Sequence, residues 1–212
     1  TGLLEKLACR IIPDHAGGDS IPELDERLMA TPAVAMERCH EVTMNMGFTS
    51  VRATRNAMHE LKNHDVKRAE SIREDERTAD RYEDELGTYL VKLSGCHLSD
   101  QDRVEAAELL HMIGDFERIS DHAVNILEST EELRGKGIAF TQPAIEEMSK
   151  MFGAVDEIMD LALTAFIHRD LSAAREVEPL EQVVDTLKEQ LRSRHILRLQ
   201  EGKCSMAAGF VW

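Results

Sequence analysis

The chain has 212 residues, with 25 lysines and arginines against 40 aspartates and glutamates, which gives a formal charge of −15 at pH 7. Apolar residues make up 42% of the sequence, enough to form a packed core, so the excess of charge does not imply disorder. A surface this negative repels the phosphates of nucleic acids and of anionic lipids. Nucleic acid is therefore excluded as a partner, and cations, metals or basic protein surfaces are favoured.

Residues 1–31 form a lead-in to the rest of the chain. A short amphipathic stretch from Leu3 to Ile12 stops at Pro13, and glycines and a second proline follow. We expect a short helix and a linker here, and because the chain opens with Thr1 we expect it to be a piece of a longer protein. The sequence has neither a run of 18 or more apolar residues nor a signal peptide, so we expect a soluble, cytoplasmic chain.

Long helices follow the lead-in, and capping residues, prolines and glycines mark their ends. Thr31 before Pro32 predicts the first start, because threonine caps free amides and proline at the first helical position loses no donor. Ser99 with Asp102 three residues later predicts another start. No segment alternates with period two over the length of a strand, so the predicted fold class is all-α. The expected helices span about residues 32–63, 66–93, 99–133, 141–168 and 171–200.

The sequence repeats itself after 105 residues, which predicts two copies of one helical unit. We expect two tandem antiparallel three-helix bundles, the first at 32–137 and the second, incomplete, at 138–212. The second bundle lacks its last helix, which we expect beyond Trp212. Such a unit would leave core exposed, which favours a homodimer or a swapped helix. The shift lays Asp65, Ala69, Ile72, Glu76, Asp80, Tyr82 and Leu86 over Asp170, Ala174, Val177, Glu181, Asp185, Leu187 and Leu191.

Three of these helices carry a glutamate and an aspartate four residues apart, on one side of the helix. The helical wheel places Glu117 inside an apolar stripe, and the other two helices repeat this arrangement. A carboxylate beside a core stripe is costly unless a cation, a donor or a metal compensates it. The pairs on the second and third helices are predicted to lie at similar heights. The pairs are Glu76 with Asp80, Glu117 with Asp121, and Glu181 with Asp185.

Hard oxygen ligands on facing helices are how helical bundles hold metal ions, so these rows predict a metal site. Asn125, four residues after Asp121, extends one row and can supply a carbonyl oxygen, whereas Glu83 is a weaker candidate. The alternative is a set of interhelical salt bridges, in which Arg73 or Arg118 pairs with the acids. The predicted metal ligands are Glu76, Asp80, Glu117, Asp121, Asn125, Glu181 and Asp185.

The run from Glu117 to Ile126 resembles the PhoU family of phosphate-uptake regulators. Proteins of that family are two tandem three-helix bundles with an E(D)xxxD motif in the second and third helices of each bundle. The resemblance implies regulation of phosphate uptake rather than catalysis. It also implies multinuclear iron or zinc clusters, which some members bind through these motifs and others lack.

A second resemblance concerns the segment before the first bundle. Residues 24–28 and 30–35 are similar to the segment that joins the membrane and PhoU-like parts of bacterial Na/phosphate cotransporter proteins. This implies a cytoplasmic C-terminal domain at the inner face of the cell membrane. The implied partner is a membrane phosphate transporter, with the N-terminal part of the same polypeptide as one candidate.

Two other functions stay open at this point. A metal-free acidic scaffold would bind a basic surface of a membrane transporter or a signalling partner. A carboxylate-bridged di-iron enzyme would need ExxH pairs, which occur at Glu37 to His40 and Glu108 to His111. Glu108 points about 180° away from Glu117, so it cannot join the same centre. No phosphate loop or nucleophile motif occurs, and we predict that the chain is not an enzyme.

Overall fold

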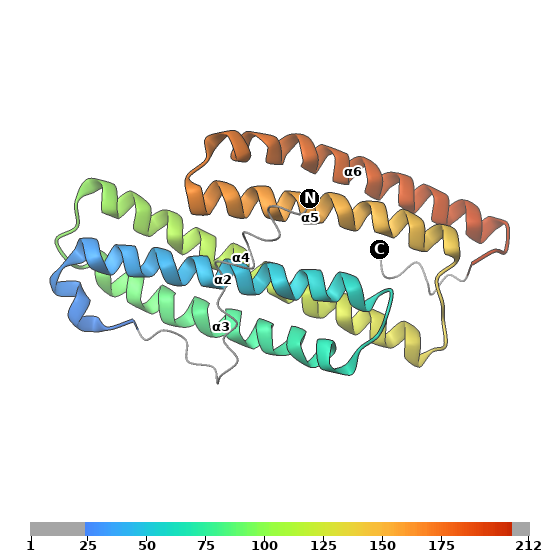
Figure 1. Ribbon diagram of the computed structural model, residues 1–212, viewed down its shortest axis with the longest axis horizontal. Helices are drawn as coiled ribbons and strands as arrows, with labels where there is room; N and C mark the ends of the chain where they lie inside the picture. The colour runs from blue at the N-terminus through green and yellow to red at the C-terminus, as the bar shows by residue number, and fades with distance from the viewer. Residues whose placement is uncertain (1–23, 205–212) are drawn as a thin grey trace, which may run out of the picture.

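The computed structural model describes residues 24–204, which form one short 3-10 helix and five long α-helices (Figure 1). The described residues contain no strand, which confirms the all-α prediction. The predicted helix from Leu3 to Ile12 lies outside the described residues. The elements are η1 (Glu26–Ala30), α2 (Pro32–Glu60), α3 (Val66–Ser94), α4 (Asp100–Gly135), α5 (Gln142–His168) and α6 (Leu171–Gln200).

The helix ends follow the signals in the sequence, with one exception. Ser99 caps α4 as predicted, because its hydroxyl accepts a hydrogen bond from the Asp102 N–H at 3.1 Å. Gly137, just after α4, adopts a φ of 64°, a left-handed conformation that glycine tolerates. The predicted cap at Thr31 is wrong, since its side chain makes no capping hydrogen bond. The start of α2 therefore relies on Pro32, whose missing donor costs nothing there.

The first unit is an antiparallel bundle of α2, α3 and α4 (Figure 1). Its core takes large apolar side chains from all three helices, and burial of each contributes about 1.5–3 kcal/mol. The packing of these side chains fixes how α3 and α4 face each other along their length. Fully buried members of this core include Val42, Met46, Ile72, Leu86, Leu90 and Leu127.

The second unit is the antiparallel pair of α5 and α6, as the repeat predicted for an incomplete copy. It lies alongside the first unit, with α5 next to α2 and α6 on the outside (Figure 1). A Cβ on Gly47 of α2 would come within 3.0 Å of Leu163 in α5, so the glycine permits this close approach. Arg55 of α2 donates to Asp156 and Asp160 of α5, each at 2.5 Å. The contact between the units is thus both apolar and ionic.

No helix among the described residues is long and apolar enough to cross a bilayer.

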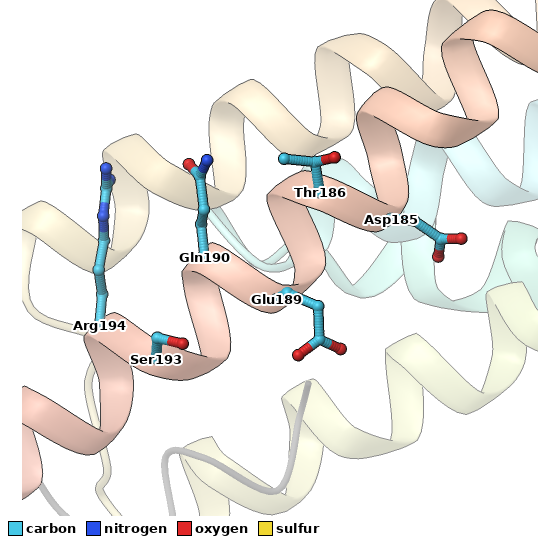
Figure 2. A pocket seen from close by; sticks show the side chains of 6 residues that line it. All are labelled: Asp185, Thr186, Glu189, Gln190, Ser193 and Arg194. Atoms are coloured by element: carbon cyan, nitrogen blue, oxygen red, sulfur yellow. The ribbon is translucent and has the colours of Figure 1, made fainter.

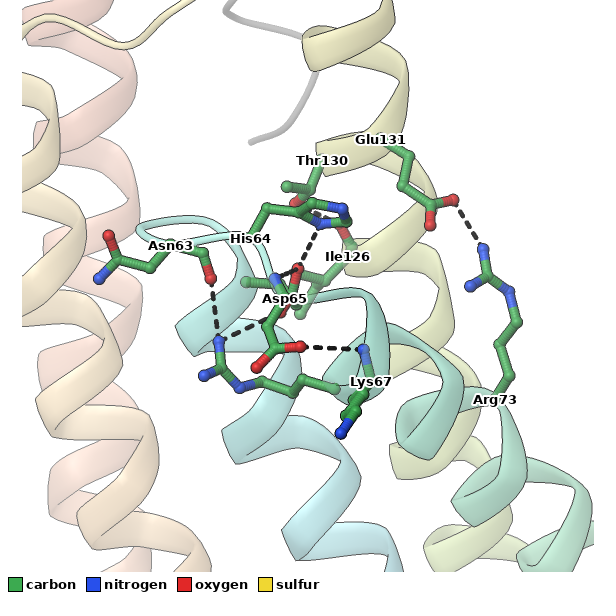
Figure 3. Close-up of polar contacts among 10 residues, drawn as sticks. Asn63, His64, Asp65, Lys67, Arg73, Ile126, Thr130 and Glu131 are labelled. Atoms are coloured by element: carbon green, nitrogen blue, oxygen red, sulfur yellow. Dashed lines mark hydrogen bonds and ion pairs between the residues drawn. The ribbon is translucent and has the colours of Figure 1, made fainter.

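The turn between α2 and α3 is built on a buried carboxylate, that of Glu60. Its oxygens accept the Asp65 N–H at 3.0 Å and an Arg68 N–H at 3.1 Å, and the Nδ1 of His64 lies 2.8 Å away (Figure 3). Asp65 in turn caps α3 by accepting the Lys67 N–H at 2.9 Å. Glu60 therefore links the last turn of α2 to the first turn of α3.

We expect Glu60→Ala to lower the free energy of unfolding by about 2–4 kcal/mol, because it leaves the Asp65 N–H and the Arg68 guanidinium without their buried acceptor. Urea unfolding followed by far-UV circular dichroism measures this loss. The control is Glu128→Ala at an exposed position of α4, which should change stability by less than about 0.5 kcal/mol. Similar losses in the two variants would contradict the role of Glu60.

Candidate metal centre

Five carboxylates lie along the contact between α3 and α4, and we call them the acidic cluster. Glu76, Asp80 and Glu83 come from α3, and Glu117 and Asp121 come from α4. The three glutamates are partly buried, whereas the two aspartates are exposed. The cluster therefore has an inner row of glutamates beside the core and an outer row of aspartates facing water.

The local sequence explains why the glutamates lie inward. Glu117 lies one turn after the buried Ile113 on the same side of α4, so its stem packs beside the core. On α4, Gly114 has no side chain, and a Cβ there would lie 3.6 Å from an Oε of Glu83. The carboxylate of Glu83 thus reaches from α3 to the surface of α4 at Gly114.

The carboxylates act on one another across the two helices. Burial raises the pKa of Glu117 above its usual value, and the charges of Asp121, Glu83, Asp80 and Glu76 raise it further. Burial likewise raises the pKa of Glu76, with Asp121 as the next contributor. The structure therefore brings the pairs on α3 and α4 together at one height. The pKa of Glu83 is also raised, by burial first and then by Asp80, although the sequence ranked Glu83 as a weaker candidate.

The cluster has no basic ion-pair partner of its own. Within residues 24–204, none of its five carboxylates lies within 4.0 Å of a lysine, arginine or histidine nitrogen. Arg73, a candidate partner in the salt-bridge alternative, instead pairs with Glu131 at 2.6 Å (Figure 3). Arg77 lowers the pKa of Glu76 only from a distance. The negative charge of the cluster is therefore left without direct compensation.

The donor chemistry fits a metal, although the side chains do not already surround one. Carboxylate oxygens from facing helices suit hard or borderline cations such as iron and zinc. In the described part of the chain, no three His, Cys, Asp or Glu side chains converge on a point that could hold an ion. Asp80, Asp121 and the nearby Asn125 are exposed, so their side chains have room to rotate toward one.

The predicted pair on α6 is placed differently. Glu181 and Asp185 are both exposed on the second unit, away from the acidic cluster. Asp185 accepts a hydrogen bond from the Lys188 ammonium at 2.7 Å. Lys188 stands 105 residues after Glu83, so the second copy has a cation where the first has an acid. The structure brings together the four residues predicted on α3 and α4 and leaves the α6 pair apart.

Comparison with known proteins assigns this architecture to a family. A PhoU domain model matches residues 43–130 and 148–209. The chain belongs to the PhoU domain family. This confirms the resemblance to the family that was noted in the sequence, and with it the expectation that the chain is not an enzyme.

Two curated PhoU homologues show the same relationship at a distance. The chain is 24% identical over 174 residues to a phosphate-specific transport system accessory protein PhoU homolog of Clostridium acetobutylicum, covering 79% of this chain and 76% of the relative. It is 28% identical over 104 residues to PhoU homolog 1 of Thermotoga maritima, covering 49% of this chain and 44% of the relative. No solved structure matches the chain.

The acidic cluster should make the free energy of unfolding of this PhoU chain depend on pH when no metal is added. The pKa values of Glu76, Glu83 and Glu117 are raised in the folded state, so the folded protein binds their protons more tightly than the unfolded protein. Their contribution to stability is therefore present at low pH and is lost as the pH rises from about 4.5 through the raised values.

We expect Glu76→Gln/Glu117→Gln to raise the melting temperature at pH 7 in chelator by about 2 °C or more, because it removes two mutually repelling charges. The gain should shrink as the pH falls toward about 4.5, where the wild-type acids bind protons. Thermal melts over this pH range test both statements. The double variant Glu128→Gln/Glu132→Gln on α4 carries the same charge change outside the cluster. A pH-independent gain, or an equal gain in that control, would contradict the prediction.

Proposed function

We propose that this PhoU chain regulates phosphate transport at the cytoplasmic face of the membrane and binds a metal at its acidic cluster. Membership of the family supports the regulatory role, as does the relative named for the phosphate-specific transport system. The partner that this role implies is a membrane phosphate transporter, either separate or part of the same polypeptide. The similarity of residues 24–35 to a linker in Na/phosphate cotransporter proteins supports the second arrangement.

The observation that carries the metal proposal is the uncompensated charge of the acidic cluster. Burial and the neighbouring carboxylates raise the pKa of its three glutamates, and no ion pair within the described residues offsets the negative charge. A bound metal cluster would supply the missing positive charge. Glu76 and Glu117 would hold it from opposite helices, and Asp80, Asp121 and Asn125 would complete the ligand set from the exposed side.

The α6 pair remains a prediction as a second metal site. Glu181 and Asp185 would need further ligands from another helix, because Lys188 already binds Asp185. The proposal therefore assigns the metal to the first unit and makes occupancy of α6 a separate question. Variants of the acidic cluster test the metal site of the first unit, and variants of Glu181 and Asp185 test the second site independently.

A metal-free scaffold is the second candidate function. It is favoured by the lack, in the described residues, of three side chains already converging on an ion. The net charge of −15 suits a basic surface on a membrane partner. In this version the acidic cluster binds lysines and arginines of the partner in place of a metal.

We expect elemental analysis of the protein, purified without added metal or chelator, to find about one equivalent or more of iron or zinc. Glu117→Gln/Asp121→Asn should lose this metal and the added thermal stability that a bound ion gives by mass action. Glu128→Gln/Glu132→Gln should retain both, since these acids lie outside the cluster. The metal content of Glu181→Gln/Asp185→Asn shows separately whether the α6 pair binds metal.

The two functions differ in the outcome of this experiment. Metal that disappears only with the cluster variant supports the proposal. Background metal in every protein, or metal that stays after the cluster is neutralised, overturns the metal site. The scaffold then predicts weaker binding to the membrane partner in the same variant.

A further inference from the structure

One side of α6 carries an uncharged row that we call the α6 stripe. Successive members are four and three residues apart in alternation, which aligns them along one side of the helix as in a coiled-coil seam. All are exposed, Val183 to 47% and Leu197 to 57%. Three of them help to line a shallow hollow on α6 (Figure 2). The α6 stripe consists of Pro179, Val183, Thr186, Gln190, Ser193 and Leu197.

The internal repeat shows that the bundle itself does not require such a row. The positions 105 residues earlier lie on α3, and four of those six residues are charged. There, Arg81 pairs with Glu85 at 3.8 Å, and Lys92 pairs with Glu26 at 2.5 Å. The same side of the helix is thus a solvated, ion-paired surface in one copy and an uncharged one in the other. The matching α3 residues are Glu74, Thr78, Arg81, Glu85, Thr88 and Lys92.

The α6 stripe is also not the side on which a third helix would complete the second unit. In the first unit, Glu76 and Glu83 lie on the side of α3 that faces α4, and they match Glu181 and Lys188. At about 100° per residue, those two positions lie roughly 180° around α6 from the centre of the stripe. A helix in the position equivalent to α4 would leave the stripe exposed.

We propose that the α6 stripe binds the α6 stripe of a second copy of this chain, with the two helices antiparallel. The charged residues beside the stripe argue for this occupant. Glu176 and Arg194 lie on the same edge of the stripe, toward opposite ends of the helix. In an antiparallel pair with twofold symmetry each edge faces the same edge of the other copy, so Glu176 meets Arg194 of the second copy twice. In a parallel pair this edge would face the opposite edge of the second copy, and Glu176 would not meet Arg194.

The register supports the same arrangement. A twofold axis near residues 184 and 185 sets Val183 beside Thr186 of the second copy and Pro179 beside Gln190. The same axis brings Glu176 to within about one residue of Arg194 along the helix. Arg194 touches Glu147 at 3.3 Å within its own chain, but its side chain is 52% exposed and keeps donors available. Pro179, Val183, Thr186 and Gln190 thus face one another in the register that also brings the opposite charges together.

The expected dimer is weak. One helix from each copy forms an interface at the low end of the size of specific interfaces. The charge of −15 on each chain also opposes approach of two copies at low salt. Association should therefore strengthen as salt rises toward physiological ionic strength, until the Glu176–Arg194 contacts are themselves screened.

Sedimentation equilibrium over a concentration series at physiological ionic strength tests this proposal. Thr186→Arg/Gln190→Glu/Leu197→Lys gives α6 the residues that α3 carries at the matching positions. The introduced arginine, glutamate and lysine are all good helix formers, so the variant should keep its fold. Circular dichroism checks this. We expect the association constant to fall about tenfold or more, or 1.4 kcal/mol. Val104→Lys, at a position of α4 that is 60% exposed, should leave it unchanged.

A charge exchange separates this pairing from a general effect on the surface. Glu176→Arg should weaken the dimer, and Glu176→Arg/Arg194→Glu should restore most of the association, because the opposite charges then meet again. Recovery in the double variant supports the antiparallel pair. A chain that stays monomeric at all concentrations, a dimer that the stripe variant leaves intact, or a double variant without recovery would each overturn the proposal.

Discussion

The apolar sides of α2, α3 and α4 must face one another, and this constraint places the acidic cluster. Once the large side chains of the three helices share one core, α3 and α4 can meet only along a fixed line. Glu76 and Glu117 lie on that line beside the buried residues, where burial and the neighbouring acids raise the pKa of both. Hydrophobic packing thus holds in place a repulsion that an ion or a basic partner would relieve.

Much of the fold could be predicted because its signals are local. Proline, glycine and Ser99 mark helix ends through backbone geometry that does not depend on the rest of the chain. The rows of acids could be predicted for the same reason, since i and i+4 share a side of any helix. The cap at Thr31 was wrong because a threonine before a helix permits a capping bond without requiring one.

The rest of the site depends on contacts between helices, which sequence spacing does not specify. Spacing could not show that Arg73 turns to Glu131 and leaves the acids without an ion pair. It ranked Glu83 low, because the approach of this side chain to Gly114 on α4 depends on how the two helices pack. The buried Glu60 gave no signal either, since its partners lie in the turn that it stabilises.

The two copies of the repeat share the same helical pattern but carry different surface residues. The first copy holds Glu83 beside its acids and charged pairs on its outer side, whereas the second holds Lys188 and an uncharged outer row. The two surfaces lie on different units, joined where Arg55 of α2 binds Asp156 and Asp160 of α5. Charge neutralisation on α3 and α4 and self-association through α6 are therefore physically separable. Coupling between them would pass through the contacts of α5 with α2 and with α4, where Phe166 packs against Phe116 and Arg169 pairs with Glu105.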